Sequence, residues 1–132
     1  MQPVIDLVTL WTDDAPRLAA FYRDVIGMEV ENDMGGYVEF RQPGVRFAIC
    51  ERKVMVDVAG LSAFAQRPEG QRVELAFPAD SPEAVDAAYD RLIEQGATPI
   101  RPPADMPWGQ RTGLFADPDG NIHEIFAPLP GA

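Results

Sequence analysis

The stretch GVRFAI at residues 44–49 can be laid over GNIHEI at residues 120–125, with glycine first and isoleucine last in both. Each stretch starts at the glycine of a turn and continues as a strand candidate. The chain around them repeats as well, because the order strand, helix, strand, strand, strand occurs twice. A repeat of this length with few identities indicates two copies of one supersecondary unit.

Capping signals mark the two helices of the repeat. Asp13 or Asp14 followed by Pro16 predicts the start of the first helix, and Ser81 followed by Pro82 predicts the second. The helices are expected to end at Gly27 and Gly96. Apolar runs between turn residues predict the strands, at residues 4–11, 28–31, 37–41, 45–50, 72–77, 98–101, 111–116 and 122–126. Residues 54–58 are a further short strand candidate, and residues 61–65 a helical turn.

These elements predict an α+β fold made of two βαβββ units within one domain of 132 residues. The first unit spans about residues 4–51, the second about 71–128, and a linker of about 52–70 joins them. Each mixed sheet is backed by one helix, and the concave faces of the two sheets are expected to form a cup. Concave apolar sites are where proteins bind small molecules.

Composition excludes several classes of partner. Twenty-one acidic and 11 basic residues give a net charge of −10, which argues against nucleic acid and anionic membranes. The charge suits a cationic or neutral ligand, and solubility alone also explains it. No targeting segment or membrane span is apparent, and the single cysteine, Cys50, forms no intrachain disulfide, so the expected location is the cytoplasm. With His123 as the only histidine, one chain builds neither a two-His-one-carboxylate iron site nor a three-His zinc site.

Three motifs carry a family resemblance: FYRDVIGM at residues 21–28, VDAAY at 85–89 followed by Gly96 and Ala97, and DPDGN at 117–121 followed by Glu124. In this order and spacing the chain resembles the vicinal oxygen chelate superfamily over roughly residues 4–128. That superfamily includes glyoxalase I, extradiol dioxygenases, fosfomycin-modifying enzymes and bleomycin-resistance proteins. The resemblance implies the duplicated fold and a homodimer.

The resemblance also implies where a metal ion would be held, on the first and last strand of each repeat. These positions fall on Leu7, Ala48, Glu74 and Glu124. Leucine and alanine have no donor atom, so no tightly held metal or other cofactor is expected, although two carboxylates suit a divalent ion such as Mg²⁺ or Ca²⁺. Glu51 does not replace Ala48, because an odd separation places it on the opposite face of the strand.

Strand alternation supplies candidate ligand-binding residues beside these positions. Thr9 and Trp11 share a face with Leu7, Arg46 and Cys50 share one with Ala48, and Phe126 shares one with Glu124. Tyr37 opens a strand, and Trp108 lies in a loop over the expected open edge of the cup. Arg46 is expected to pair with Glu74 and Glu124, either as part of a ligand site or as a purely structural pair. Trp11, Phe126 and Cys50 serve equally as core fillers, and His123 is expected to face away from the cup in a structural role.

Two functions follow from the resemblance. In the first, the protein resembles the bleomycin-resistance type and sequesters a flat, drug-like molecule in the cup of a homodimer, giving antibiotic resistance without catalysis. In the second, it resembles glyoxalase I or a related lyase, isomerase or transferase that depends on a divalent metal, with Glu124 as general base. The histidine count disfavours a ring-cleaving dioxygenase. A third hypothesis is that the chain is an accessory or interaction domain.

Overall fold

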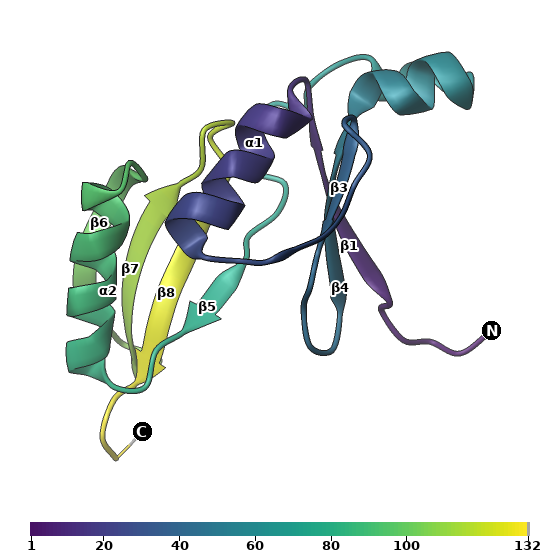
Figure 1. Cartoon of the computed structure of the whole chain (residues 1–132). Coiled ribbons are helices and arrows are strands. Elements are labelled where there is room, and N and C mark those ends of the chain that lie inside the picture. The colour runs from purple at the N-terminus through teal and green to yellow at the C-terminus, as the bar shows by residue number, and fades with distance from the viewer. Residues whose placement is uncertain (132) are drawn as a thin grey trace. The chain divides into compact units, whose positions relative to one another are not determined.

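The computed structural model describes residues 1–131, and the chain divides into two compact units, Met1–Arg67 and one that begins at Pro68. Each unit has one four-stranded mixed sheet backed by one helix (Figure 1). The predicted α+β fold with a repeated βαβββ order is therefore confirmed. The boundary falls within residues 52–70, the predicted linker.

The first unit places its last strand in the middle of the sheet. The strand order is β1-β4-β3-β2, with β1 parallel to β4 and the other pairs antiparallel. Its elements are β1 (Leu7–Thr12), α1 (Ala15–Phe21), a π-helical turn (Tyr22–Ile26), β2 (Val30–Asp33), β3 (Tyr37–Phe40) and β4 (Arg46–Glu51).

Two carboxylates accept hydrogen bonds from amides at the start of α1, Asp14 just before the helix and Glu51 at the end of β4. The Asp14 carboxylate accepts a hydrogen bond from the Arg17 amide at 3.1 Å, as its predicted capping role requires. The Ala15 amide donates to Glu51 Oε2 at 2.9 Å, and Glu51 is buried. Glu51 therefore lies on the helix-covered face of the sheet, opposite to Ala48, as alternation predicted.

Aromatic packing holds α1 and its π-helical extension to that face. The Tyr22 ring is fully buried, 5.2 Å from the Phe47 ring, and Phe47 stacks on Phe40 at 5.7 Å. Leu18 and Phe21 are buried beside them. On the opposite face of the sheet, the Trp11 ring contacts Phe64, which follows β4 in the same unit.

The second unit repeats this plan. The strand order is β5-β8-β7-β6, with β5 parallel to β8. Ser81 caps α2 by accepting from the Ala84 amide at 3.1 Å, as predicted. Its elements are β5 (Ala76–Pro78), α2 (Pro82–Glu94), β6 (Thr98–Met106), β7 (Gln110–Ala116) and β8 (Ile122–Pro128).

Two strand predictions are corrected. Residues 54–58 form a π-helical turn (Val54–Val58) and not a strand. Only two residues separate them from the end of β4, too few for the chain to turn back, and both edges of β4 are already paired, with β1 and β3. The 3-10 turn Ser62–Phe64 follows, where a helical turn was predicted. The strand expected at 72–77 begins only at Ala76, because the Gln71 side chain takes the place of a backbone ladder by accepting from Ile122 N (3.2 Å) and donating to Ile122 O (2.8 Å).

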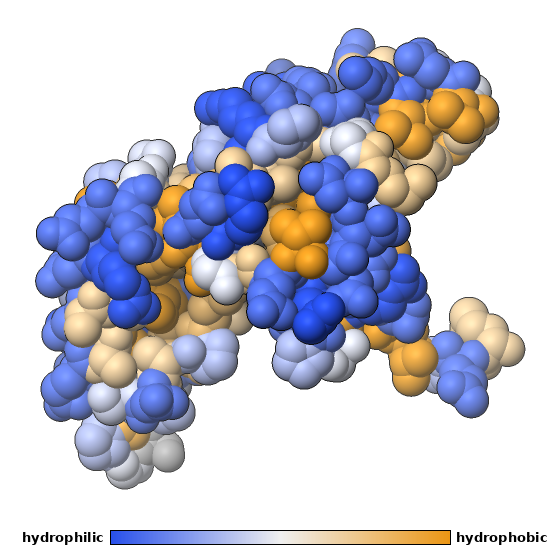
Figure 2. All heavy atoms as spheres, in the orientation of Figure 1, coloured by the Kyte–Doolittle hydropathy of each residue, from blue (hydrophilic) through white to orange (hydrophobic). Residues whose placement is uncertain are grey.

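Apolar side chains reach the surface along the segment after β4. Val58 and Leu61 are exposed there, and Figure 2 shows apolar atoms at the end of this helical segment. No helix within residues 1–131 combines the length and the apolar character that crossing a membrane requires.

Candidate functional site

The face of the second sheet that α2 leaves uncovered carries a line of opposed residues. Ala76 of β5 lies opposite Glu124 of β8, Glu124 lies opposite Leu114 of β7, and Leu114 lies opposite Arg101 of β6. Side chains at directly opposed positions share a face. Glu124 and Arg101 therefore project from the same surface, which we call the carboxyl face.

Glu74 joins Glu124 on this face. The Glu124 amide donates to the Leu75 carbonyl at 3.0 Å, which holds the chain before β5 against β8. Glu74 lies two residues before Ala76 and so shares its side of the strand. Burial raises the pKa of the Glu124 carboxyl, and the neighbouring Glu74, within hydrogen-bonding reach, raises it further. The Glu124 carboxyl group therefore holds its proton more tightly than a free glutamate does.

Arg101 supplies the positive charge of the carboxyl face, and its charge opposes the rise in the pKa of Glu124. Its Nη2 donates to the Thr112 carbonyl at 3.0 Å and to Thr112 Oγ1, and its Nη1 contacts Met106 Sδ at 3.1 Å. Its buried Nε has no hydrogen-bond partner among the residues that the structure describes. Arg101 was not predicted as a site residue, because Pro102 and Pro103 obscure the continuation of its strand.

Arg46 forms ion pairs within the first unit. It donates to Glu39 at 2.8 and 3.0 Å and to Asp6 at 2.9 Å. The cause is the register of the first sheet, which places Glu39 opposite Ala48, diagonal to Arg46. Arg46, with the Tyr37 hydroxyl that donates to Glu39 at 2.7 Å, lowers the pKa of Glu39 to about 2.

The other candidates of the first unit share the face of its sheet opposite to α1, and several of them make contacts within the unit. The register aligns Leu7 with Arg46, Thr9 with Ala48, and both Trp11 and Tyr37 with Cys50. Ala48 and Cys50 are buried, and burial raises the pKa of the Cys50 thiol. The Trp11 ring meets Phe64 edge-on at 4.7 Å. These contacts favour packing roles for Trp11 and Cys50.

Two aromatic candidates belong to the second unit. Phe126 lies opposite Thr112 on the carboxyl face, two residues beyond Glu124. Trp108, in the turn between β6 and β7, is 66% exposed, and its Nε1 donates to Gln110 at 3.2 Å. Phe126 is thus beside the carboxyl pair, and Trp108 is open to solvent.

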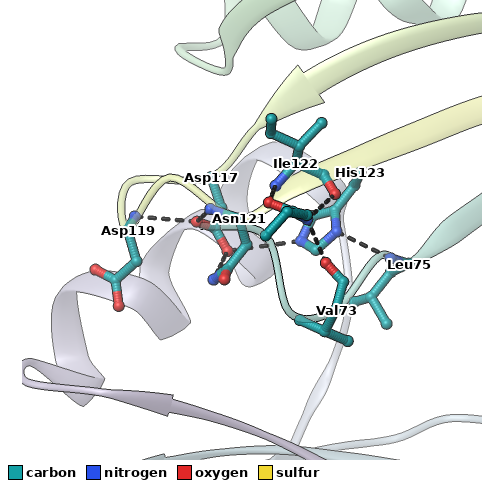
Figure 3. Close-up of polar contacts among 8 residues, drawn as sticks. Val73, Leu75, Asp117, Asp119, Asn121, Ile122 and His123 are labelled. Atoms are coloured by element: carbon teal, nitrogen blue, oxygen red, sulfur yellow. Dashed lines mark hydrogen bonds and ion pairs between the residues drawn. The ribbon is translucent and has the colours of Figure 1, made fainter. Parts of the chain in front are cut away.

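His123 is fully buried on the face of the sheet opposite to Glu124, as alternation predicted. Figure 3 shows its polar contacts. Its Nδ1 accepts from the Leu75 amide at 3.0 Å, and its Nε2 faces Asp117 Oδ2 at 3.6 Å. Asp117 in turn accepts from the Asp119 and Asn121 amides at 3.0 Å each and from Asn121 Nδ2 at 2.8 Å. This network ties the turn before β8 to the segment that carries Glu74.

Of the four positions that the resemblance implies for a metal, only two, Glu74 and Glu124, have donor side chains. In the second unit these two carboxyl groups lie beside the Arg101 charge. Within the described part of the chain, residues 1–131, no three His, Cys, Asp or Glu side chains gather in a way that could hold an ion.

Comparison with known proteins identifies the family. The model of the Glyoxalase/Bleomycin resistance protein/Dioxygenase superfamily matches residues 4–125. The chain belongs to this superfamily. The resemblance of the three motifs is thereby confirmed, and the superfamily accounts for the duplicated unit.

Individual proteins are similar to the chain over most of its length. The uncharacterized protein YraH of Bacillus subtilis (strain 168) is 30% identical over 127 residues, covering 92% of this chain and 96% of YraH. The crystal structure of a glyoxalase/bleomycin resistance protein/dioxygenase from Nocardioides has a TM-score of 0.88 at 34% identity, covering 100% of this chain and 87% of that one. A lactoylglutathione lyase from Agrobacterium tumefaciens shares the fold, with a TM-score of 0.73 at 24% identity over 96% of this chain and 95% of that one.

Because the pKa of Glu124 is raised in the folded protein, we expect the stability of the fold to depend on pH. The folded protein holds this proton more tightly than the unfolded chain, so the favourable contribution is complete below the ordinary glutamate pKa and is lost as pH rises through the raised value. Glu124→Gln is therefore expected to raise Tm at pH 7 relative to the unmodified protein, with the difference vanishing near pH 4. Thermal unfolding at both pH values checks this, with the exposed Glu69→Gln as control. A shift that is equal at both pH values contradicts it.

Proposed function

We propose that this protein binds a small organic molecule on the carboxyl face and holds it without a tightly bound metal, as a drug-sequestering member of its superfamily. The observation that carries the proposal is the Glu74–Glu124 pair beside Arg101, together with the absence of donor atoms at Leu7 and Ala48. Two neighbouring carboxyl groups can bind an amine or amidine through charge-assisted hydrogen bonds without a metal. We extend the proposal to a homodimer in the cytoplasm, as the family resemblance implies.

The chemistry of the face favours a flat cation as ligand. The chain carries a net charge of −10, which raises the local concentration of cations. Phe126 offers an aromatic surface next to Glu124, and cation–π contacts contribute about 0.5–2 kcal/mol each. Leu114 adds apolar area between Glu124 and Arg101.

The test is a titration of the purified protein with proflavine, a planar cation, followed by tryptophan fluorescence and by calorimetry, together with metal analysis. The double variant Glu74→Gln/Glu124→Gln is expected to weaken binding at least about tenfold, because hydrogen bonds to charged groups contribute most to such contacts. The control Glu69→Gln should bind like the unmodified protein. The proposal fails if no binding occurs, if the double variant binds equally well, or if one zinc or nickel ion per chain is retained tightly.

One observation favours a second candidate, an enzyme of the glyoxalase I or transferase type. A carboxyl group whose pKa is raised above the ordinary glutamate value, as in Glu124, is a stronger general base. Glu124 would take the proton next to a carbonyl group of the substrate. Incubation with the hemithioacetal of methylglyoxal and glutathione, with and without divalent ions, tests this. Turnover that Glu124→Gln abolishes supports it, and no turnover under any condition contradicts it.

A further inference from the structure

Arg101 carries a positive charge on the carboxyl face that a purely cationic ligand leaves unused. It lies on β6 directly opposite Leu114 of β7, which in turn lies opposite Glu124 of β8. The side chain is half-buried, and its Nη2 donates to the Thr112 carbonyl at 3.0 Å and to Thr112 Oγ1. Because Thr112 lies opposite Phe126, its hydroxyl projects from the carboxyl face. The guanidinium that binds this hydroxyl therefore lies on the same face, over β7.

No carboxylate neutralises the Arg101 charge by contact. Within residues 1–131 its hydrogen bonds go to neutral acceptors, Thr112 and, at 3.1 Å, the sulfur of Met106, which is a weak acceptor. These contacts use three of the five N–H groups of the guanidinium. By contrast, Arg111 of the same sheet donates to the Asp86 carboxylate of α2 at 2.7 Å. Arg101 therefore keeps the capacity to attract a negative group from outside the chain.

The two carboxyl groups of the face have no cationic partner in contact either. In the part of the chain that the structure describes, no ion pair joins Glu74 or Glu124 to an arginine or lysine. Arg101 acts on Glu124 through its charge and not through a hydrogen bond. The carboxyl face thus presents separated charges of both signs, and one ligand that carries both charges complements them.

The surface between the charges is apolar and limits the length of such a ligand. Neighbouring strands lie about 4.8 Å apart, so β6 and β8 are about 10 Å apart across β7. Because the guanidinium reaches over Thr112 of β7, its distance from the Glu124 carboxyl is about one to two strand spacings, or ~5–10 Å. Leu114 and Phe126, both half-buried, occupy the other two corners of this square. One aromatic ring with a charged group at each end fits the spacing.

We propose that the carboxyl face selects zwitterionic aromatic ligands, and that Arg101 is the residue that determines this specificity. The inference rests on the proposed function and adds a negative group to its ligand. The ammonium or amidinium group lies at Glu74 and Glu124, and the ring packs on Leu114 and Phe126. The carboxylate of the ligand lies over the Arg101 guanidinium. Since Coulomb attraction leaves the hydrogen bonds of Arg101 in place, no part of the sheet has to move.

The test compares 4-(aminomethyl)benzoate, which has opposite charges at the two ends of one ring, with its methyl ester, which keeps the ring and the ammonium group but has no negative charge. In ¹H–¹⁵N NMR titrations of the full chain, the zwitterion is expected to bind about three- to fivefold more tightly than the ester, as one partly exposed ion pair allows. Both compounds should shift amides of β7 and β8.

The outcomes separate this inference from the proposed function. If the zwitterion binds no more tightly than the ester while proflavine still binds through Glu74 and Glu124, the specificity assigned to Arg101 is wrong and the proposed function stands. If neither compound nor proflavine binds, both proposals fail.

Arg101→Met keeps the length of the side chain and removes its charge. The variant is expected to lose the preference for the zwitterion over the ester, whereas proflavine, a cation that Arg101 repels, should bind equally or more tightly. Arg101→Lys keeps the charge and should retain part of the preference. The matched control is Arg91→Met, which removes an exposed charge from α2 and should change nothing. Weakening of all three compounds together in Arg101→Met, or a preference that survives in it, contradicts the proposal.

Discussion

Replacing Asp117 by alanine is expected to lower the free energy of unfolding by about 3 kcal/mol. Asp117 is 2% exposed, and its carboxylate accepts from the amides of Asp119 and Asn121 and from the Asn121 side chain. Alanine leaves these donors without their acceptor. The turn that leads into β8 then loses the contacts that set its shape.

Urea unfolding followed by circular dichroism measures the loss, with two control variants. Asp117→Asn keeps an acceptor for the two backbone amides and should cost less than half as much. Asp33→Ala removes an exposed carboxylate that caps the Gly35 amide at 2.9 Å in a comparable turn, and should cost under about 1 kcal/mol because water replaces it. If Asp117→Ala costs no more than Asp33→Ala, burial of the network is not what stabilises the turn.

The elements that could be predicted from the sequence are those whose signals are local. A capping carboxylate or hydroxyl three residues before a free amide marks a helix start, and Asp14 and Ser81 form these bonds. Alternation along a strand also needs no distant partner, so Glu51 and His123 were assigned to the correct faces. The repeat added the equivalence of Ala48 and Glu124, which lie on corresponding strands.

Side-chain partners across strands could not be predicted, because they depend on register. Arg46 pairs with Glu39 since β3 and β4 align that carboxylate beside it, and a shift of two residues would have removed the contact. Arg101 lies opposite Leu114 because the pairing of β6 with β7 shifts register between Pro99 and Arg101. Neither event leaves a local pattern in the sequence.

The site residues also differ in whether a local signal predicts them. Residue type alone shows that Leu7 and Ala48 have no donor atoms. The proximity of Glu74 to Glu124 depends instead on the hydrogen bonds that hold residues 71–75 against β8. In place of regular backbone pairing, the Gln71 side chain accepts from the Ile122 amide and the His123 ring accepts from the Leu75 amide. His123 is thereby a structural residue with an effect on the functional face.

His123→Phe is expected to cost about 2–3 kcal/mol of unfolding free energy, although the ring volume is nearly kept. Phenylalanine leaves the Leu75 amide, which donates to Nδ1 at 3.0 Å, without an acceptor, and it removes the ring nitrogen that faces Asp117. His123→Asn retains a side-chain oxygen near the position of Nδ1 and should preserve the Leu75 hydrogen bond at the cost of a cavity.

Hydrogen exchange of the Leu75 amide distinguishes the two variants, because only the phenylalanine variant should lose its protection. Since Leu75 follows Glu74 directly, the phenylalanine variant should also weaken proflavine binding more than the asparagine variant does, even if their unfolding free energies are similar. Equal Leu75 exchange in both variants would mean that the backbone contact with Glu124 alone, at 3.0 Å, holds Glu74 in place. The affinity of the carboxyl face would then depend on the strand pairing of β5 with β8 and not on the buried histidine beneath it.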